Sequence, residues 1–362
     1  MRLGVEAALV RGELVRGDVE IVDGRVADVG LGGGGRGLAV PGFVDLQVNG
    51  FGGVDFLNAS SADYDTAGEA LCQTGVTAYQ PTLITSPEEE LLAALREVPA
   101  RAFGPRIIGV HLEGPFLSAA RIGAHPPSAR RDPDQALLER LLAAGHVTEM
   151  TLAPELPGAL ELIGLLAARG IVVSCGHTDA TAGEAYAAFA RGARTVTHVF
   201  NAMRPFGHRD PGIAGAALVD DRIVVQIILD GHHMADETAA LVWRVARGRV
   251  AVVTDAMAAA GNGDGRFVLG GTRVDVVDGI ARNADGALAG SVGTMIEAVR
   301  GLVALGASVE DAVGAASEVP GRLTGQPGLG VLEPGGPADV VVLDDRLEIE
   351  QVLVAGDGHV LA

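Results

Sequence analysis

Three residues of this sequence supply ligands suited to a metal ion, and a fourth supplies a proton acceptor. Glu113, His177 and His198 each end an apolar run, and together they offer one carboxylate and two imidazoles. Catalytic zinc sites commonly use three protein ligands and keep a fourth position for water. Asp255 ends another apolar run, and a carboxylate beside an activated water can take its proton and deliver it to a leaving group. The four residues therefore indicate a hydrolytic metal site.

Each of these residues also has a purely structural interpretation. A single buried His or Glu is usually satisfied by hydrogen bonds alone, and an Asp such as Asp255 is favoured as a helix cap. The metal site is preferred because all three ligands fall at equivalent strand ends. Cys175 shares a strand face with His177 and is expected to fill core space. His111 shares a face with Glu113 and is expected to support it or to pack behind it.

A barrel is the fold that would bring these residues together. Apolar runs alternate with helical stretches, and strands buried on both faces and separated by helices are typical of a (β/α)8 barrel. The predicted strands are Phe43–Val48, Thr77–Leu83, Arg106–Glu113, Val147–Leu152, Ile171–His177, Thr195–Val199, Ile223–Leu229 and Val250–Asp255. The predicted helices are Pro87–Val98, Pro133–Ala144, Gly158–Ala168, Thr181–Arg191, Asp236–Arg247, 293–305 and 308–316. Chemistry in such barrels lies at the carboxyl ends of the strands, where the polar residues fall.

The two ends of the chain show short alternating strands separated by tight turns. Neither end has enough strands to be stable alone. We therefore expect residues 1–41 and 334–362 to pair into one small β-sandwich domain. Residues 42–333 would form the catalytic barrel, interrupted by a β-hairpin insert near 267–290.

The composition limits the classes of function open to the chain. It has 362 residues, of which 48% are hydrophobic, so a large core is possible. The net charge of −19 argues against a nucleic-acid or anionic membrane partner. No apolar run reaches the roughly 18 residues that a transmembrane helix needs. The first residues carry no signal-peptide pattern, so we expect a cytoplasmic protein.

All 27 basic residues are Arg, and the sequence contains no Lys. This excludes a P-loop lysine and a Schiff-base lysine. It also excludes the carboxylated lysine that bridges two metals in several metal-dependent hydrolases. Two cysteines are too few for a disulfide scaffold. Any catalysis must rest on His, Asp, Glu, Ser, Cys or a metal.

Five segments of the chain together resemble the N-acetylglucosamine-6-phosphate deacetylases, a family of the amidohydrolase superfamily. The segments are Pro41–Gly50, His111–Phe116, Gly176–Ala180, Thr197–Met203 and Val253–Ala256. Each is weak alone, but their order and spacing are specific. The resemblance implies a (β/α)8 barrel of the metal-dependent amidohydrolase type. It also implies hydrolysis of the acetamide of N-acetylglucosamine 6-phosphate to acetate and glucosamine 6-phosphate.

The resemblance also implies roles for individual residues. The residues already taken as metal ligands and as acid/base keep those roles. His125 is similar to the residue that polarises the acetyl carbonyl, and Asn201 and Ala202 resemble the substrate-binding pair. His233 matches another substrate-contacting histidine. Arg209 resembles the arginine that reaches the phosphate in the neighbouring subunit, which implies a homodimer with shared active sites.

One motif departs from the wider superfamily and bears on the number of metals. Many members have His-x-His at the end of the first strand and bind two ions, whereas this chain has Gln47 and Asn49 there. Amide side chains are poor metal ligands, and no lysine is available as a bridge. We expect one divalent ion per subunit, with Zn²⁺ as the leading choice. Fe²⁺ and Co²⁺ accept the same donor set, and whether Gln47 contacts the metal site directly or through water stays open.

The sequence is also compatible with two other functions. The first is an amidohydrolase acting on a cyclic amide or a nucleobase. It is disfavoured by Gln47, Asn49 and the missing lysine, because such sites usually need both metals. The second is a non-catalytic sugar-phosphate-binding protein that kept the barrel. Its mark would be a lost ligand or base, and none is lost here.

Overall fold

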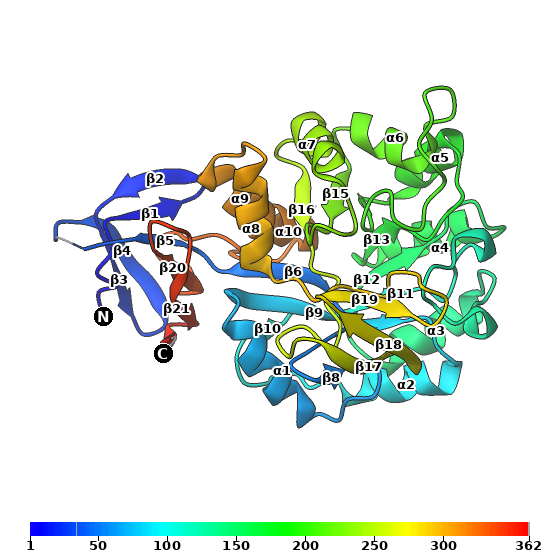
Figure 1. The fold of residues 1–362 in the computed structure, drawn as a ribbon, viewed down its shortest axis with the longest axis horizontal. Helices are drawn as coiled ribbons and strands as arrows, with labels where there is room; N and C mark the ends of the chain where they lie inside the picture. The colour runs from blue at the N-terminus through cyan, green and yellow to red at the C-terminus, as the bar shows by residue number, and fades with distance from the viewer. Residues whose placement is uncertain (34, 361–362) are drawn as a thin grey trace.

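The computed structural model describes residues 1–33 and 35–360. A nearly closed parallel barrel carries a smaller β unit at one end, and both chain termini lie in that unit (Figure 1). The predicted (β/α)8 barrel with a small β unit from both chain ends is confirmed. Within the described residues, no helix is long and apolar enough to cross a membrane.

The barrel wall is a ring of parallel strands whose residues are almost all buried. In order, the strands are β6 (Phe43–Val48), β9 (Val76–Ile84), β11 (Val110–Glu113), β12 (Val147–Leu152), β13 (Val172–Cys175), β14 (Thr195–Val196), β15 (Val224–Ile227) and β16 (Val250–Val252). A short strand, β10 (Arg106–Ile107), also pairs with β9. Burial on both faces explains why these strands are rich in apolar residues, although several of them also carry a buried polar residue such as Asp45 or Glu149.

The ring closes between β6 and the segment that follows β16. The backbone N–H of Asp255 donates to the carbonyl of Gln47 at 3.0 Å. The buried carboxylate of Asp45 accepts the backbone N–H of Thr254 at 3.2 Å and its hydroxyl at 2.6 Å. Burial raises the pKa of Asp45 to about 7, although its bonds to Thr254 oppose this shift. The closure therefore depends on polar contacts as well as on strand pairing.

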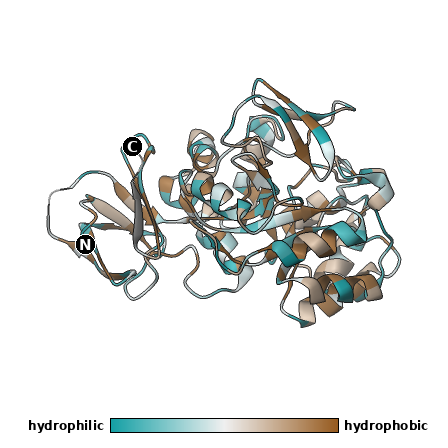
Figure 2. Cartoon of the chain, turned by 90° about the horizontal axis from the view of Figure 1, so that it is seen from below, coloured by the Kyte–Doolittle hydropathy of each residue, from teal (hydrophilic) through white to brown (hydrophobic). Residues whose placement is uncertain are grey.

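Helices surround the barrel, and most bury one face. They are α1 (Asp63–Cys72), α2 (Glu88–Glu97), α3 (Gln135–Ala144), α4 (Ala159–Ala168), α5 (Ala182–Arg191), α6 (Gly212–Val219), α7 (Asp236–Val245), α8 (Met295–Ala304), α9 (Val309–Ala316) and α10 (Glu318–Thr324). Hydrophilic and hydrophobic residues alternate along the helices in Figure 2, as expected for one buried face. The sequence missed α1, α6 and α10; α6 is buried on nearly every side, so it lacks an amphipathic period.

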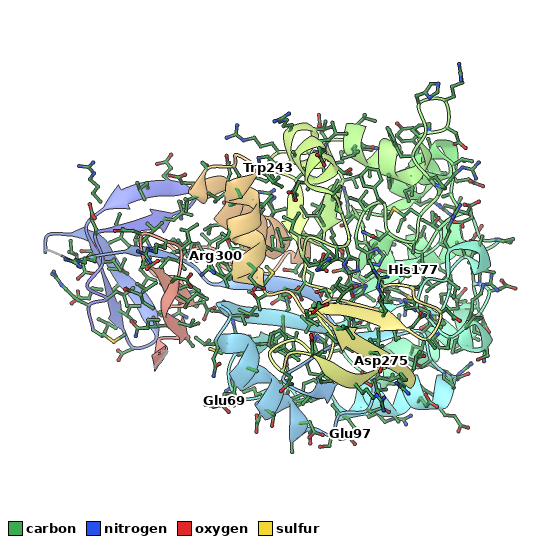
Figure 3. The ribbon with its side chains drawn as sticks, viewed as in Figure 1. Glu69, Glu97, His177, Trp243, Asp275 and Arg300 are labelled. Carbon is green, nitrogen blue, oxygen red and sulfur yellow. The ribbon has the colours of Figure 1, made fainter. Side chains whose placement is uncertain are left out.

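The small β unit has two layers. Its larger sheet has the order β2–β1–β5–β20–β21–β22, and a hairpin of β3 and β4 packs on it. The strands are β1 (Ala7–Val10), β2 (Glu13–Arg16), β3 (Asp18–Val22), β4 (Arg25–Leu31), β5 (Leu38–Pro41), β20 (Val340–Leu343), β21 (Ile349–Val354) and β22 (Asp357–Val360). Arg300 of α8 donates to the carbonyl of Leu347 at 2.7 Å and so ties the barrel to this unit (Figure 3). The boundaries at residues 41 and 334 stay a prediction.

The insert after β16 is larger than the predicted hairpin. It is an antiparallel sheet of β17 (Gly265–Leu269), β18 (Thr272–Val277) and β19 (Ile280–Asn283). Its inner face packs against Ile84, at the end of β9, and against Met257. A smaller hairpin of β7 (Gly50–Phe51) and β8 (Val54–Asp55) follows β6. Both additions lie at the carboxyl ends of the strands.

The interior below the strand ends is polar. Gln226 of β15 donates to Glu149 of β12 at 2.8 Å, and burial raises the pKa of Glu149 to about 8. His111 contacts Thr151 through Nε2 at 2.8 Å and Thr82 through Nδ1 at 3.2 Å. Burial lowers the pKa of His111 to about 4. His111 therefore belongs to a neutral hydrogen-bonded layer under the site.

The closure at Asp45 predicts a difference between two substitutions. Asp45→Ala leaves the N–H groups of Thr254 and Gln47 without their buried acceptor, so we expect a loss of about 3 kcal/mol of stability. Asp45→Asn keeps one acceptor oxygen and is expected to cost less than about 1 kcal/mol. Thermal unfolding midpoints measure both. Equal midpoints for the two variants would show that the contact does not support closure.

Candidate metal and catalytic site

Three of the predicted site residues have a left-handed backbone where the barrel strands end. The φ angles of His177, His198 and Asp255 are 47°, 30° and 51°. Such a conformation costs a non-glycine residue about 1–2 kcal/mol, and it turns the chain out of the strand. For this reason β13, β14 and β16 stop two or three residues before the functional side chain. The sequence predicted longer strands there, because apolar runs do not reveal this turn.

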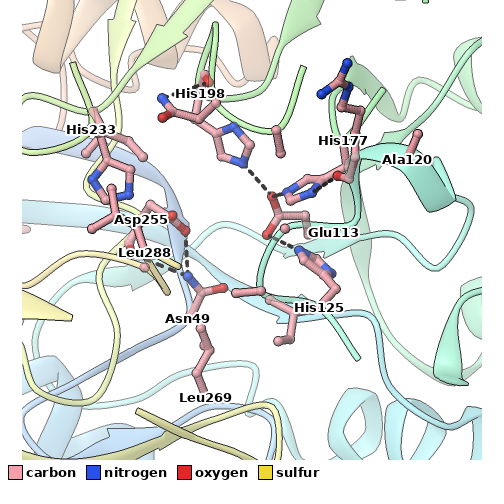
Figure 4. A pocket seen from close by; sticks show the side chains of 18 residues that line it. Asn49, Glu113, Ala120, His125, His177, His198, His233, Asp255, Leu269 and Leu288 are labelled. Atoms are coloured by element: carbon pink, nitrogen blue, oxygen red, sulfur yellow. Dashed lines mark hydrogen bonds and ion pairs between the residues drawn. The ribbon is translucent and has the colours of Figure 1, made fainter. Parts of the chain in front are cut away.

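The carboxylate of Glu113 is the meeting point of three imidazoles (Figure 4). The Nε2 atoms of His177 and His198 lie 3.1 and 3.0 Å from the same oxygen, Oε1. His125 Nε2 lies 3.6 Å from the other oxygen, Oε2. All four side chains are buried. Burial alone would raise the pKa of Glu113, but the histidines hold it well below its usual range, so the carboxylate is ionised.

These residues form a cluster that could hold a cation. The ligand atoms of Glu113, His125 and His177 all lie within 4.8 Å of one another. This group contains His125 where the sequence predicted His198, which approaches the same carboxylate from the other side. Burial, followed by the nearby His125, lowers the pKa of His177 to about 4, so its ring is neutral and able to act as a ligand. The distances alone do not decide whether His125 or His198 is the third metal ligand.

Hydrogen bonds at Nδ1 separate the two choices. His177 Nδ1 lies 3.1 Å from the carbonyl of Arg121, which accepts a hydrogen on Nδ1 and so allows Nε2 to give its lone pair to a cation. His125 Nδ1 instead accepts the backbone N–H of Thr85 at 3.3 Å. A neutral His125 therefore carries its hydrogen on Nε2 and is a donor rather than a ligand. His198 Nδ1 is buried without a partner among the described residues, so its Nε2 stays open to a ligand role.

Two amides connect the acidic groups of the site. Gln47 Nε2 donates to Glu113 Oε1 and to Asp255 Oδ1, both at 3.1 Å. Asn49 Nδ2 donates to the same Asp255 oxygen at 2.7 Å. Gln47 thus contacts the site directly. In the described part of the chain no hydrogen bond reaches Asp255 Oδ2, which leaves that oxygen for a proton. Burial, followed by the charge of Glu113, raises the pKa of Asp255 to about 6.

A pocket of about 370 Å³ opens over this cluster. It brings together all the predicted site residues except one: Glu113, His125, His177, His198, Asn201, Ala202, His233 and Asp255. The exception is Arg209, which is exposed on the loop before α6 and does not line the pocket. That loop is held at its base by Arg204, whose guanidinium contacts Asp179 at 3.1 Å and Asp210 at 2.7 Å.

The sequence missed several residues that shape the pocket. Ile84, Leu269 and Leu288 form an apolar part of its lining, and two of them come from the insert and the loop that follows it. Nothing in the sequence signals that the insert folds back over the barrel end. Arg121 was also missed; its carbonyl orients His177 from η1 (Ala119–Arg121), and η2 (Pro127–Ala129) follows it.

The chain matches the family model described as the amidohydrolase family over residues 38–358. Human N-acetylglucosamine-6-phosphate deacetylase is 40% identical over 353 residues, which cover 92% of this chain and 86% of that protein. An N-acetylgalactosamine-6-phosphate deacetylase from Escherichia coli O157:H7 is 37% identical over 327 residues, covering 88% and 87%.

Solved structures show the same likeness in three dimensions. A variant of N-acetyl-D-glucosamine-6-phosphate deacetylase from Mycobacterium smegmatis, in complex with N-acetyl-D-glucosamine-6-phosphate, is 39% identical with a TM-score of 0.93. The match covers 100% of this chain and 99% of that one. The Thermotoga maritima deacetylase is 32% identical with a TM-score of 0.91, covering 99% of each chain. The chain belongs to the amidohydrolase family, with sugar-phosphate deacetylases as its relatives.

Proposed function

We propose that the protein hydrolyses the acetamide of N-acetylglucosamine 6-phosphate, giving acetate and glucosamine 6-phosphate. The observation that carries this proposal is the buried carboxylate of Glu113, with His177 and His198 on one of its oxygens and Asp255 beside it in the pocket. Likeness over the whole chain to a solved deacetylase that holds this sugar phosphate supports the substrate class.

A cytoplasmic location is proposed as well, since both cysteines are buried and unpaired, as is usual in reducing compartments.

We propose one divalent ion per subunit, Zn²⁺ being our choice, held by Glu113, His177 and His198. The donor set fits, because it combines an ionised carboxylate with imidazoles and suits a catalytic zinc site. Gln47 directs its N–H₂ group, a donor, at both carboxylates, so its nitrogen does not serve as a ligand for a second ion. The chemistry such an ion supplies is a water of lowered pKa and a polarised carbonyl.

Asp255 would then transfer the proton, and His125 would stabilise the charge on the acetyl oxygen. Asp255 takes the proton of the attacking water at Oδ2, because amide donors already occupy Oδ1. His125 donates from Nε2 to the acetyl oxygen as negative charge develops there. The water oxygen forms a bond to the acetyl carbon, the C–N bond then breaks, and Asp255 returns the proton to the departing nitrogen. The products are acetate and the free amine.

Substrate binding is proposed to use both subunits of a homodimer. Asn201 and Ala202 line the pocket on the loop after β14, and His233 lines it on the loop after β15. Arg209 is exposed and does not line its own pocket, which suits a contact with the phosphate in a neighbouring subunit. Phe206 on the same loop is 52% exposed, and an apolar side chain there suits a subunit interface.

Acetate release from N-acetylglucosamine 6-phosphate tests the function directly. We expect the purified protein to turn over at about one per second or faster. N-acetylgalactosamine 6-phosphate should be assayed beside it, because a relative from Escherichia coli carries that substrate in its name. No acetate from either sugar, in protein that holds its metal, would reject the proposal.

Asp255→Asn and the pH profile test the base in the same assay. The variant should lose about 10²–10⁴-fold in kcat and keep its metal. Asp255 accepts a proton only when ionised, so activity should fall as pH drops below its pKa. That pKa is about 6 without a cation, and a bound cation lowers it, so kcat/KM should decline at or below pH 6. A decline centred well above pH 6, or near-normal turnover by the variant, would remove Asp255 from this role.

Metal content separates the two possible ligand sets. We expect about one tightly bound ion per chain, lost in His177→Ala and His198→Ala but kept in His125→Ala, because the His125 tautomer makes it a donor. Elemental analysis after dialysis measures this. The assignment is wrong if His125→Ala loses the ion while His198→Ala keeps it, and two tightly bound ions per chain would refute a single-metal site.

Arg209→Ala tests the shared site. The variant should raise KM for the phosphorylated sugar by about tenfold or more, and leave kcat/KM for unphosphorylated N-acetylglucosamine unchanged. Sedimentation should show a dimer for wild type and variant alike. Equal losses on both sugars, or a monomer that is fully active, would contradict the role.

A further inference from the structure

The loop after β15 contains a carboxylate–imidazole pair that the proposed mechanism does not use. Asp230 Oδ2 lies 2.7 Å from His233 Nδ1. Its other oxygen, Oδ1, accepts the backbone N–H of His232 and of His233, each at 2.9 Å. Gly231 between them has a φ of +76°, which lets the loop turn back on Asp230. One carboxylate therefore fixes both the backbone and the ring of His233.

The contact at Nδ1 determines which edge of the ring meets a ligand. His233 lines the pocket, whereas Asp230 does not and contacts His233 only at Nδ1 and the backbone. In Figure 4, His233 lies on the same side of the pocket as Asp255, with His177 opposite. Because Nδ1 is bonded to Asp230, Nε2 is the ring atom left for a molecule in the pocket.

Burial makes this pair an electrostatic unit. The side chains of His233 and Asp230 are only 6% and 9% exposed. Burial alone would raise the pKa of Asp230, but the hydrogen bond and charge of His233 lower it to about 2, so Asp230 is an anion. An imidazole with a carboxylate on Nδ1 and an anionic ligand on Nε2 carries a hydrogen on each nitrogen. The arrangement suits a charged donor rather than a neutral acceptor.

Few other basic groups in the pocket could bind an anion. Three of the histidines that line it face Glu113, which leaves Arg121 and His233. The guanidinium of Arg121 is engaged with Asp179 at 2.8 Å and its side chain is 31% exposed. A contact to a buried donor is screened less by water and salt than one at an exposed donor. His233 is therefore the better anion donor within one subunit.

We propose that Asp230 is a positioning residue that holds His233 as a hydrogen-bond donor to the phosphate of the substrate. The inference rests on the proposed function for the identity of the anion. Asp230 touches neither the substrate nor the reacting atoms, and it acts only through the imidazole. Its effect should thus appear in binding of the phosphorylated sugar and not in the chemical step.

Asp230→Asn is the informative substitution because it keeps the backbone turn and changes only the group that faces His233 Nδ1. The amide oxygen can still accept the backbone N–H groups of His232 and His233. The amide nitrogen, however, presents hydrogens to Nδ1, so the ring must accept there and donates from Nε2 without an anion on its other nitrogen, which makes its hydrogen bond to phosphate weaker than a charge-assisted one. We expect KM for N-acetylglucosamine 6-phosphate and Kd for glucosamine 6-phosphate to rise about tenfold or more. We expect kcat to change less than about threefold, and kcat/KM for N-acetylglucosamine to stay the same.

A matched control comes from the small β unit. Asp344 Oδ1 accepts the backbone N–H of Arg346 and of Glu348 at 2.8 and 2.7 Å, and no histidine is among its hydrogen-bond partners in the described residues. Asp344→Asn makes the same chemical change at a turn far from the pocket and should leave every constant unchanged. Thermal midpoints and metal content, measured on all variants, would separate a loss of fold from a loss of phosphate binding.

A double substitution tests whether Asp230 acts through His233. If it does, adding Asp230→Asn to His233→Gln should weaken glucosamine 6-phosphate binding no further. A further tenfold loss in that background would overturn the inference, as would an unchanged KM in the single variant or equal losses on both sugars.

Calorimetry with glucosamine 6-phosphate needs no turnover. If the wild type released no acetate, the function proposal would fail, and the calorimetric comparison would still decide the role of Asp230. Equal affinity of wild type and Asp230→Asn would reject it.

Discussion

The rest of the site depends on Glu113, a carboxylate that is buried at the mouth of the barrel. Taking the ionised Glu113 out of water costs several kcal/mol unless partners replace the lost hydration. The structure provides imidazoles from three separate loops and the amide of Gln47. These groups meet only when the ring of strands closes, so the electrostatics of the site and the completion of the fold depend on each other. The negative charge of Glu113 would also stabilise a bound cation, because the cluster is built around that charge.

The backbone at the strand ends contributes a second constraint. His177, His198 and Asp255 all have left-handed conformations, which are unfavourable for side chains with a Cβ atom. Backbone hydrogen bonds hold all three: the carbonyl of His177 accepts the N–H of Ser118, the carbonyl of His198 accepts the N–H of Asn201, and the N–H of Asp255 donates to the carbonyl of Gln47. Strain of this kind persists only where the surroundings over-determine it. The left-handed residues that follow the strands thus turn the functional side chains inward, and these hydrogen bonds keep them there.

Much of this architecture could be predicted because its signals are local. The strand Val250–Val252 is a continuous apolar run, and the polar Asp255 that follows it pointed to the site. What escaped prediction depends on contacts between distant segments. The turn at His177 that shortens β13, the carbonyl of Arg121 behind that ring, and the insert bearing Leu269 leave no periodic trace in the sequence. The residue types of the metal site were therefore predictable, whereas the hydrogen bonds that assign their roles required the fold.

The polar layer beneath the site couples folding to proton uptake. Burial raises the pKa of Glu149 to about 8 and that of Asp45 to about 7, whereas unfolded carboxyls titrate near pH 4. At neutral pH the folded chain therefore binds protons that the unfolded chain has released. This contribution to stability is fully present below about pH 4 and is lost as pH rises through 7 and 8. Refolding in a weakly buffered neutral solution should consequently make the solution more alkaline.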